Sequence, residues 1–147
     1  MSALPPLMRD QRPIDADHLR LLAIFHFVAA AFALAGIAFL FLHYSLMHMA
    51  FADPRAWKTQ PQGITPMQFM AIFRWFYVVF GLWFILSGVI NVISGFFLRA
   101  RRHRTFSLVV AGINCLYMPF GTILGIFTIL VLGRGSVREM YEARRLG

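Results

Sequence analysis

The chain has 147 residues, of which 59% are hydrophobic and only 14% charged, and its mean hydropathy is +0.68. A soluble domain carries about 25% charged residues, so this composition excludes an ordinary water-soluble domain. The net charge of +8 could suggest nucleic-acid binding, but the basic residues lie at the ends of apolar runs and form no basic face. They indicate control of membrane topology and attraction to anionic lipids. We expect one membrane domain that does not bind nucleic acid.

The N-terminal third predicts a short leader followed by the first membrane helix. Residues 1–14 contain three prolines and mixed charges, which is typical of a flexible cytoplasmic segment. Asp15 or Asp17 can cap the helix that follows, over residues 15–50. An apolar run of 22 residues within it, interrupted only by His26, is long enough to cross a hydrocarbon layer of about 30 Å. We expect this helix to be transmembrane.

A polar outer loop over residues 52–65 precedes the second helix. Thr65, Pro66 and Gln68 have the arrangement of a helix start, with threonine as N-cap, proline at the first helical position and glutamine at the third. They predict a helix over residues 66–98, and its C-terminal part carries no charge. The first turns of this helix are expected to stand in the outer membrane interface.

A basic loop, residues 99–104, follows the second helix and contains four arginines. Such a cluster directly after a span marks the cytoplasmic side of a membrane. It therefore places the N-terminus inside and the loop before the second helix outside. Five arginines are expected to contact lipid headgroups, one at the outer interface and four on the cytoplasmic side: Arg74, Arg99, Arg101, Arg102 and Arg104.

The last apolar run, residues 105–133, has 29 residues without a charge. It is too long for one ordinary span and too short for two. Pro119 cannot continue a preceding helix, and Gly121 follows it, so we expect a helical hairpin that turns at Pro119. Each leg has about 14 residues, or roughly 21 Å, and whether the hairpin crosses the membrane or re-enters stays open. One kinked helix is the alternative, but it would place the C-terminal arginines outside.

Residues 136–146 predict an amphipathic cytoplasmic tail. Ser136 and Glu139 have the spacing of a capping box. Three residues share the apolar side of this helix: Val137, Met140 and Tyr141. With arginines around them, they predict a helix that lies on the membrane surface.

Together these elements predict an all-α integral membrane protein. It has two long transmembrane helices plus a short C-terminal helical hairpin, which makes four membrane helices, with both ends in the cytoplasm. The segment Pro-Phe-Gly-Thr-Ile-Leu-Gly-Ile-Phe-Thr from Pro119 to Thr128 resembles a signature of small, uncharacterised bacterial membrane proteins with four helices. The resemblance covers the last third of the chain. It implies a similar hairpin in a multi-pass protein of the bacterial inner membrane, and it implies no activity.

Small residues recur at helical spacing, and such stripes let membrane helices approach closely. They are Ala29, Ala33 and Gly36 in the first helix, Gly81, Gly88 and Gly95 in the second, and Gly121 and Gly125 in the hairpin. These stripes exceed what one small bundle needs. We therefore expect a structural or accessory module that associates with copies of itself or with a membrane-protein partner.

Five polar residues interrupt the predicted membrane helices: His26, Ser87, Asn91, Ser94 and Asn114. Because an unpaired polar group is costly in lipid, Asn91 and Asn114 are expected to hydrogen-bond to each other or to nearby backbone. His26 is expected to bond to Ser94 or to a backbone carbonyl, with a proton-linked role as the alternative. A second candidate function uses the serines and asparagines to line an oligomeric channel or transporter for a small solute or ion.

His43, Met47 and His48 lie near the outer end of the first helix. Imidazole and thioether ligands suit Cu(I), so copper handling at the outer face is a third hypothesis, beside the simpler interpretation of interfacial packing. No arrangement of acidic, Ser–His or Cys–His residues indicates catalysis, and no phosphate loop or dinucleotide fingerprint is present. We therefore predict no enzymatic activity and no cofactor.

Overall fold

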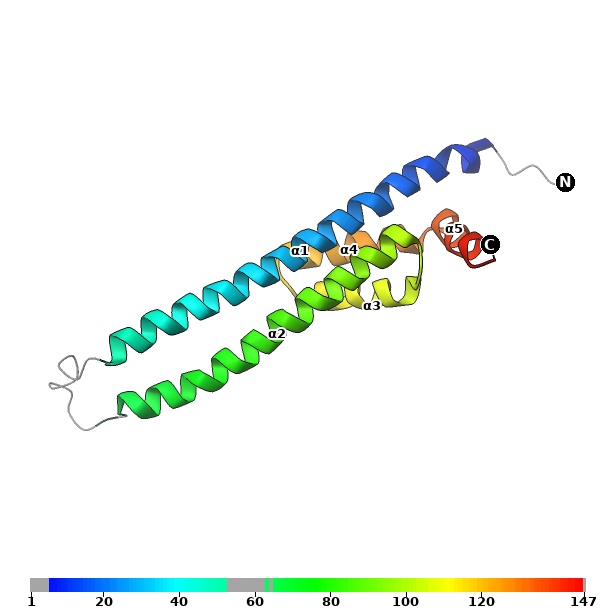
Figure 1. The fold of residues 1–147 in the computed structure, drawn as a ribbon. Coiled ribbons are helices and arrows are strands. Elements are labelled where there is room, and N and C mark those ends of the chain that lie inside the picture. Colours follow the sequence, from blue (N-terminus) through cyan, green and yellow to red (C-terminus); the bar gives the residue numbers. More distant parts are fainter. Residues whose placement is uncertain (1–5, 53–62, 64, 147) are drawn as a thin grey trace. The chain divides into compact units, whose positions relative to one another are not determined.

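The computed structural model describes residues 6–52, 63 and 65–146, and every regular element in them is a helix. Figure 1 shows the five helices, which are α1 (Pro6–Ala52), α2 (Pro66–Ala100), α3 (Arg104–Asn114), α4 (Phe120–Gly133) and α5 (Gly135–Leu146). The chain divides into two compact units. We call Met1–Ala30 together with Val89–Gly147 the hairpin unit, and Ala31–Gly88 the helix-pair unit. The expected all-α fold is confirmed for the described residues.

Two of these helices are long and apolar enough to cross a membrane. The candidate spans are Gln11–Phe51 in α1, with 41 residues, and Gln68–Ala100 in α2, with 33 residues. The prediction of two helices of membrane-spanning length is thus confirmed. The apolar α4 and the polar α5 reach span length only as a pair, and they are bent by 73° at the break between them. Length and composition therefore support two spans, or three if the bent pair counts as one.

α1 begins at Pro6, so the expectation of a flexible leader over residues 1–14 is wrong for residues 6–14. Proline is favoured in the first turn of a helix, where its missing N–H would have had no partner. Asp15 and Asp17 consequently lie inside α1, and neither caps its start. Residues 1–5 of the expected leader lie outside the described residues.

Within the helix-pair unit, α1 and α2 run antiparallel and meet through aromatic side chains. The Phe84 ring lies against Gly36, where an added Cβ would come within 2.8 Å of the ring. Further along, a hydrogen bond of 2.7 Å joins Nδ1 of His43 to the Tyr77 hydroxyl. The Phe84 ring fits here because Gly36 has no side chain. A larger residue at position 36 would displace the ring.

The start of α2 has the cap expected from the sequence. The backbone N–H of Gln68 donates to the Thr65 hydroxyl oxygen over 3.3 Å, and the Gln68 side-chain oxygen accepts from the Thr65 N–H over 3.0 Å. These reciprocal bonds satisfy two backbone donors that a helix start would otherwise leave unpaired. Most of the outer loop over residues 52–65 lies outside the described residues.

α3 and α4 form the expected hairpin, packed side by side through glycine. A Cβ added to Gly125 would lie 2.3 Å from the Ala111 carbonyl oxygen, and one added to Gly121 would lie 2.5 Å from the Asn114 carbonyl oxygen. At the open end of the hairpin, Nε of Arg104 donates to the carbonyl of Leu132 over 2.9 Å. The alternative of one kinked helix over residues 105–133 is therefore wrong.

The hairpin turn combines an apolar surface with backbone groups that bond locally. The N–H groups of Cys115, Leu116 and Tyr117 donate to carbonyls of the last turns of α3. The hydroxyl of Thr122 donates to the Cys115 carbonyl over 2.8 Å. Three large apolar side chains around the turn are mostly exposed: Leu116, Met118 and Phe120. Several backbone groups of the turn therefore find their hydrogen-bond partners within the hairpin itself.

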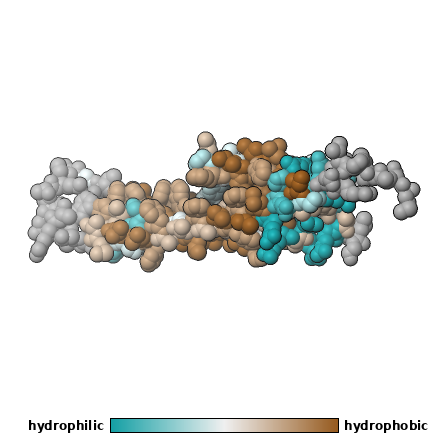
Figure 2. All heavy atoms as spheres, turned by 90° about the horizontal axis from the view of Figure 1, so that it is seen from above, coloured by the Kyte–Doolittle hydropathy of each residue, from teal (hydrophilic) through white to brown (hydrophobic). Residues whose placement is uncertain are grey.

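α5 packs onto the hairpin unit through its apolar face, so this face contacts protein. The expected position of α5 on the membrane surface stays a prediction. Val137 is fully buried and belongs to a core cluster with Leu19, Leu22, Leu98 and Leu132. Partly buried Met140 packs against the same cluster. In Figure 2, hydrophilic residues gather around the part of the hairpin unit that carries α5. The polar face of α5 is therefore the one that remains uncovered.

Candidate functional site

Asp15 is a buried carboxylate that connects α1 to the break between α4 and α5. Its side chain is only 3% exposed, and it accepts a hydrogen bond of 2.8 Å from the guanidinium of half-exposed Arg134. The Ser136 hydroxyl donates to its second carboxylate oxygen. The expected capping box of Ser136 with Glu139 is therefore wrong, because Ser136 bonds to Asp15 and Glu139 pairs with Arg12 at 3.6 Å.

Asn91 and Asn114 form the expected amide pair inside the hairpin unit. Each side-chain amide donates to the other's oxygen, over 3.1 Å and 2.9 Å, and both residues are buried. The reciprocal geometry connects α2 to the end of α3 just before the turn. It confirms the interhelical bond predicted from the sequence.

Asn91→Leu is expected to lower the free energy of unfolding by about 1–2 kcal/mol, because it leaves the buried Asn114 amide without this partner. Asn91→Leu/Asn114→Leu should cost less than the sum of the two single variants, since the pair acts as a unit. Thermal unfolding in a mild detergent measures both. A single variant as stable as the parent, or additive losses, would contradict this account.

Other polar side chains are buried in the hairpin unit with fewer partners. Nδ1 of His26 donates to the carbonyl of Leu22 over 3.0 Å, which confirms a backbone partner. Nε2 of His26 and the hydroxyls of Ser94 and Ser107 are buried and meet no partner among the described residues. The alternative of a His26–Ser94 bond is thus not realised. Ser87, which belongs to the helix-pair unit, is also buried.

The small residues are used mainly inside the chain. Gly36, Gly95, Gly121 and Gly125 each accept a close neighbour from the same chain, and Ala33 is buried. Ala29 and Gly88 are partly buried, whereas a Cβ on Gly81 would meet nothing within 4 Å. Four of the predicted packing glycines are thus occupied within the chain, whereas Gly81 is open. Association with a second copy or a membrane-protein partner stays a prediction.

The two histidines among the expected metal ligands lie near the C-terminal end of α1 and take part in aromatic contacts. His43 bonds to Tyr77, and the His48 ring lies 6.1 Å from the Tyr44 ring, centroid to centroid. Among the described residues, no three of His, Cys, Asp and Glu are grouped as a metal site. Met47 is partly buried. The copper hypothesis for His43, Met47 and His48 stays a prediction.

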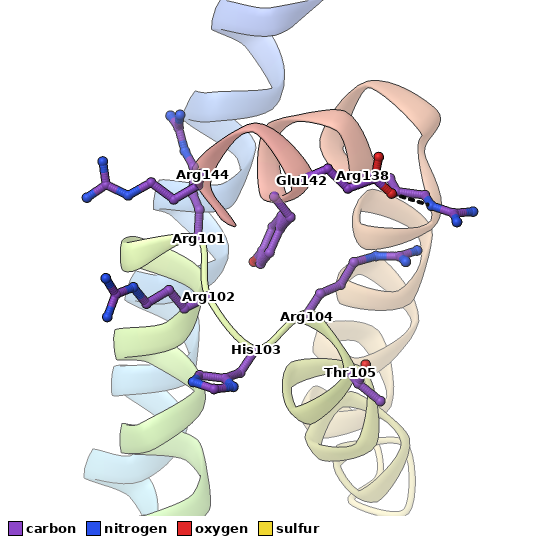
Figure 3. Close-up of a pocket in the computed structure, with 9 residues that line it drawn as sticks. Arg101, Arg102, His103, Arg104, Thr105, Arg138, Glu142 and Arg144 are labelled. Atoms are coloured by element: carbon purple, nitrogen blue, oxygen red, sulfur yellow. Dashed lines mark hydrogen bonds and ion pairs between the residues drawn. The ribbon is translucent and has the colours of Figure 1, made fainter. Parts of the chain in front are cut away.

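The hollow with the strongest charge lies where the α2–α3 connection faces α5, within the hairpin unit (Figure 3). It has a volume of about 660 Å³ and we call it the basic pocket. Five arginines line it, with one acidic residue and three others: Arg101, Arg102, Arg104, Arg138, Arg144, Glu142, His103, Thr105 and Tyr141. In Figure 3, Arg102 and Arg144 extend on one side and Arg104 and Arg138 on the other. Arg99 and Arg74 are exposed and do not line it.

The connection that forms the pocket floor has an unusual backbone. The N–H of Arg102 donates to the Phe97 carbonyl over 2.9 Å, and the N–H of Arg101 donates to the Leu98 carbonyl over 3.3 Å. This pairing is the Schellman helix ending, whose left-handed residue is usually glycine. Here that residue is Arg101, at φ 52°, and His103 is left-handed as well, at φ 50°. The conformation presents an arginine to the pocket where glycine would fit with less strain.

Tyr141 contributes a hydroxyl to the basic pocket. Its side chain is 8% exposed, and the hydroxyl oxygen has no hydrogen-bond partner among the described residues. Burial raises the pKa of Tyr141 to about 12, although Arg104 and Arg101 act to lower it. The hydroxyl therefore remains protonated at neutral pH and can donate a hydrogen bond to an anion.

The sequence predicted three arginines of this pocket as lipid headgroup contacts, namely Arg101, Arg102 and Arg104. No sequence signal indicated that α5 lies beside them. Arg138, Tyr141, Glu142 and Arg144 reach the site only because α5 folds back over the end of α2. No protein-family model, curated protein or solved structure matches the chain.

Proposed function

We propose that the chain is a multi-pass protein of a bacterial inner membrane with both ends in the cytoplasm. The arginine cluster after α2 supports a cytoplasmic position for that end of the helix. The hairpin of α3 and α4 is expected to enter from the same side and to turn inside the hydrocarbon. At 11 and 14 residues, its legs measure about 16 and 21 Å, less than the roughly 30 Å of the apolar layer.

Its proposed function is that of an accessory module that acts by helix association, without a catalytic site or cofactor. The observation that carries this proposal is open Gly81 on α2, because lipid alone can cover the exposed apolar side chains of the helix-pair unit. Phe32, Phe41 and Trp75 are 71%, 73% and 67% exposed. Two helices bury only the faces that they present to each other. Open Gly81 offers this surface a point of close approach, and we propose that a second copy of the chain docks there.

Gly81→Leu is expected to weaken self-association by at least about tenfold, because the larger side chain blocks close approach. A Cβ added at Gly81 would meet nothing within 4 Å, so we expect the monomer of the variant to fold as the parent does. Single-molecule photobleaching in liposomes at falling protein-to-lipid ratios measures the change. Gly112→Leu is the matched control, since Gly112 is equally open but lies on α3. The proposal is overturned if the parent protein is monomeric at every protein-to-lipid ratio. It is also overturned if Gly81→Leu associates as strongly as the parent protein.

The channel or transporter alternative has less support. Its proposed lining residues, Asn91 and Asn114, bond to each other, and Ser94 is fully buried. Flux through an oligomer would require these groups to face a continuous path. The resemblance to small four-helix membrane proteins adds no activity to either interpretation.

A further inference from the structure

Two arginines of the hairpin unit outside the basic pocket have a buried or partly exposed acidic partner, whereas most of the arginines inside the pocket have none among the described residues. Arg12 pairs with Glu139, and Arg134 with Asp15. Within the pocket and among the described residues, only Arg138 forms an ion pair, with Glu142 at 3.1 Å. Arg101, Arg102 and Arg144 meet no carboxylate among the residues described. Five arginines against one glutamate therefore leave a formal pocket charge of +4, from groups that match phosphate geometry.

A buried donor supplies a second, independent indication of a ligand. A buried hydroxyl without a partner costs about 1–3 kcal/mol. The Tyr141 hydroxyl is in this state and lines the same hollow. An anionic oxygen within the pocket would accept its hydrogen bond and remove the cost.

The backbone conformation at the end of α2 is a third indication of a ligand site. A non-glycine residue in the left-handed region costs about 1 kcal/mol, and such strain is typical of functional positions. Arg101 holds this conformation at the α2 ending. The Arg101 side chain lines the pocket. The chain therefore has an arginine at a position where glycine would make a more stable helix ending.

We propose that the basic pocket binds the phosphate of an anionic phospholipid headgroup in the cytoplasmic leaflet. This inference rests on the membrane placement proposed above. A lipid is favoured over a free phosphate because the pocket adjoins uncovered apolar surface, which acyl chains can cover. Phe96 on α2 and Val109 on α3 are each 57% exposed, within the last turns of α2 and the first turns of α3. The site thus offers charge for the headgroup and hydrocarbon for the chains.

Arg101→Gly separates binding from stability. It relieves the left-handed strain, so the thermal midpoint of the full-length protein should stay equal or rise, while affinity for phosphatidylglycerol should fall by about tenfold. The measurement is binding of fluorescent phosphatidylglycerol to the protein in phosphatidylcholine nanodiscs. Arg99→Gln is the matched control, because it removes one charge from the same basic cluster outside the pocket. Equal losses of affinity in Arg101→Gly and Arg99→Gln would show that basic residues attract the lipid in general. That result would overturn the proposal of a specific pocket.

Two further variants test the pocket chemistry. Tyr141→Phe removes only the unpartnered hydroxyl, so it should lower affinity by about fivefold without loss of stability. Glu142→Gln raises the pocket charge and frees Arg138, so it should increase affinity. A second experiment measures the binding of inorganic phosphate to the protein in pure phosphatidylcholine nanodiscs. Tight phosphate binding that depends on Arg101, without preference for phosphatidylglycerol, overturns the lipid assignment.

This test is distinct from that of the proposed function. Gly81→Leu should bind phosphatidylglycerol as the parent does, because Gly81 lies outside the hairpin unit. A protein that does not insert into nanodiscs contradicts the membrane placement itself. A protein that inserts and shows no dependence on Arg101 or Tyr141 contradicts only the pocket.

Discussion

Gly125→Leu is expected to prevent the α3–α4 hairpin from closing, and Gly125→Ala to destabilise the protein by about 2–3 kcal/mol. Even a Cβ at this position would lie 2.3 Å from the Ala111 carbonyl oxygen and 2.5 Å from the Cys115 sulfur. Backbone is the nearest obstacle, so the clash can be relieved only by moving the two helices apart. Overpacking of this kind costs about 1–3 kcal/mol, and more when backbone must shift.

Cys115 provides a direct measurement because it is the single cysteine of the chain. Its thiol lies against Gly125, so opening of the hairpin should raise its rate of reaction with a maleimide in detergent. The matched control is Gly112→Ala, which meets nothing within 4 Å and should stabilise α3 by about 0.5–1 kcal/mol through helix propensity. If both alanine variants shift stability in the same direction, glycine packing does not hold this hairpin together.

Asp15→Ala is expected to lower the free energy of unfolding by about 2–4 kcal/mol. Removal of one partner from a buried ion pair leaves the other uncompensated, and here the Ser136 hydroxyl also loses its acceptor. Arg134 is 45% exposed, so water compensates part of its loss and the effect stays below that of a fully buried pair. Asp15→Asn should cost less, because an amide oxygen can still accept one of the two hydrogen bonds.

The comparison for Asp15 is Asp17→Ala, which removes the same charge from an exposed position on the same helix. It should change stability by no more than about 0.5 kcal/mol. Urea-induced unfolding in mixed micelles, followed by circular dichroism, compares the variants. Comparable losses at both positions would mean that helix charge, rather than the contact with α4 and α5, sets the stability.

Local signals predicted most of the helices because each depends on a few neighbouring residues. Thr65 and Gln68 lie three positions apart, and they form the cap that their spacing predicts. Pro119 lacks an N–H and cannot extend α3, so the helices break beside it. Asn91 and Asn114 were the two amides in adjacent apolar runs, and an unpaired amide in apolar surroundings is costly.

Long-range contacts were missed for the opposite reason. Asp15 is 119 residues from Arg134 and 121 from Ser136, and no local pattern relates them. An aspartate near a helix start resembles an N-cap, and Ser136 with Glu139 resembles a capping box. In each case a tertiary partner competes successfully with the local hydrogen bond. The same folding-back of α5 brings Tyr141 to the arginines.

Composition and the spacing of prolines, arginines and amides were enough to determine an all-helical chain with two long apolar helices and a short hairpin. These properties follow from hydropathy over a span and from backbone chemistry at single residues. The tertiary structure alone decided that four of the predicted packing glycines have close neighbours from the same chain, that Asp15 joins α1 to α4 and α5, and that α5 completes a basic pocket. Those outcomes depend on which side chains meet after distant helices pack, and the order of residues along one helix does not contain that information.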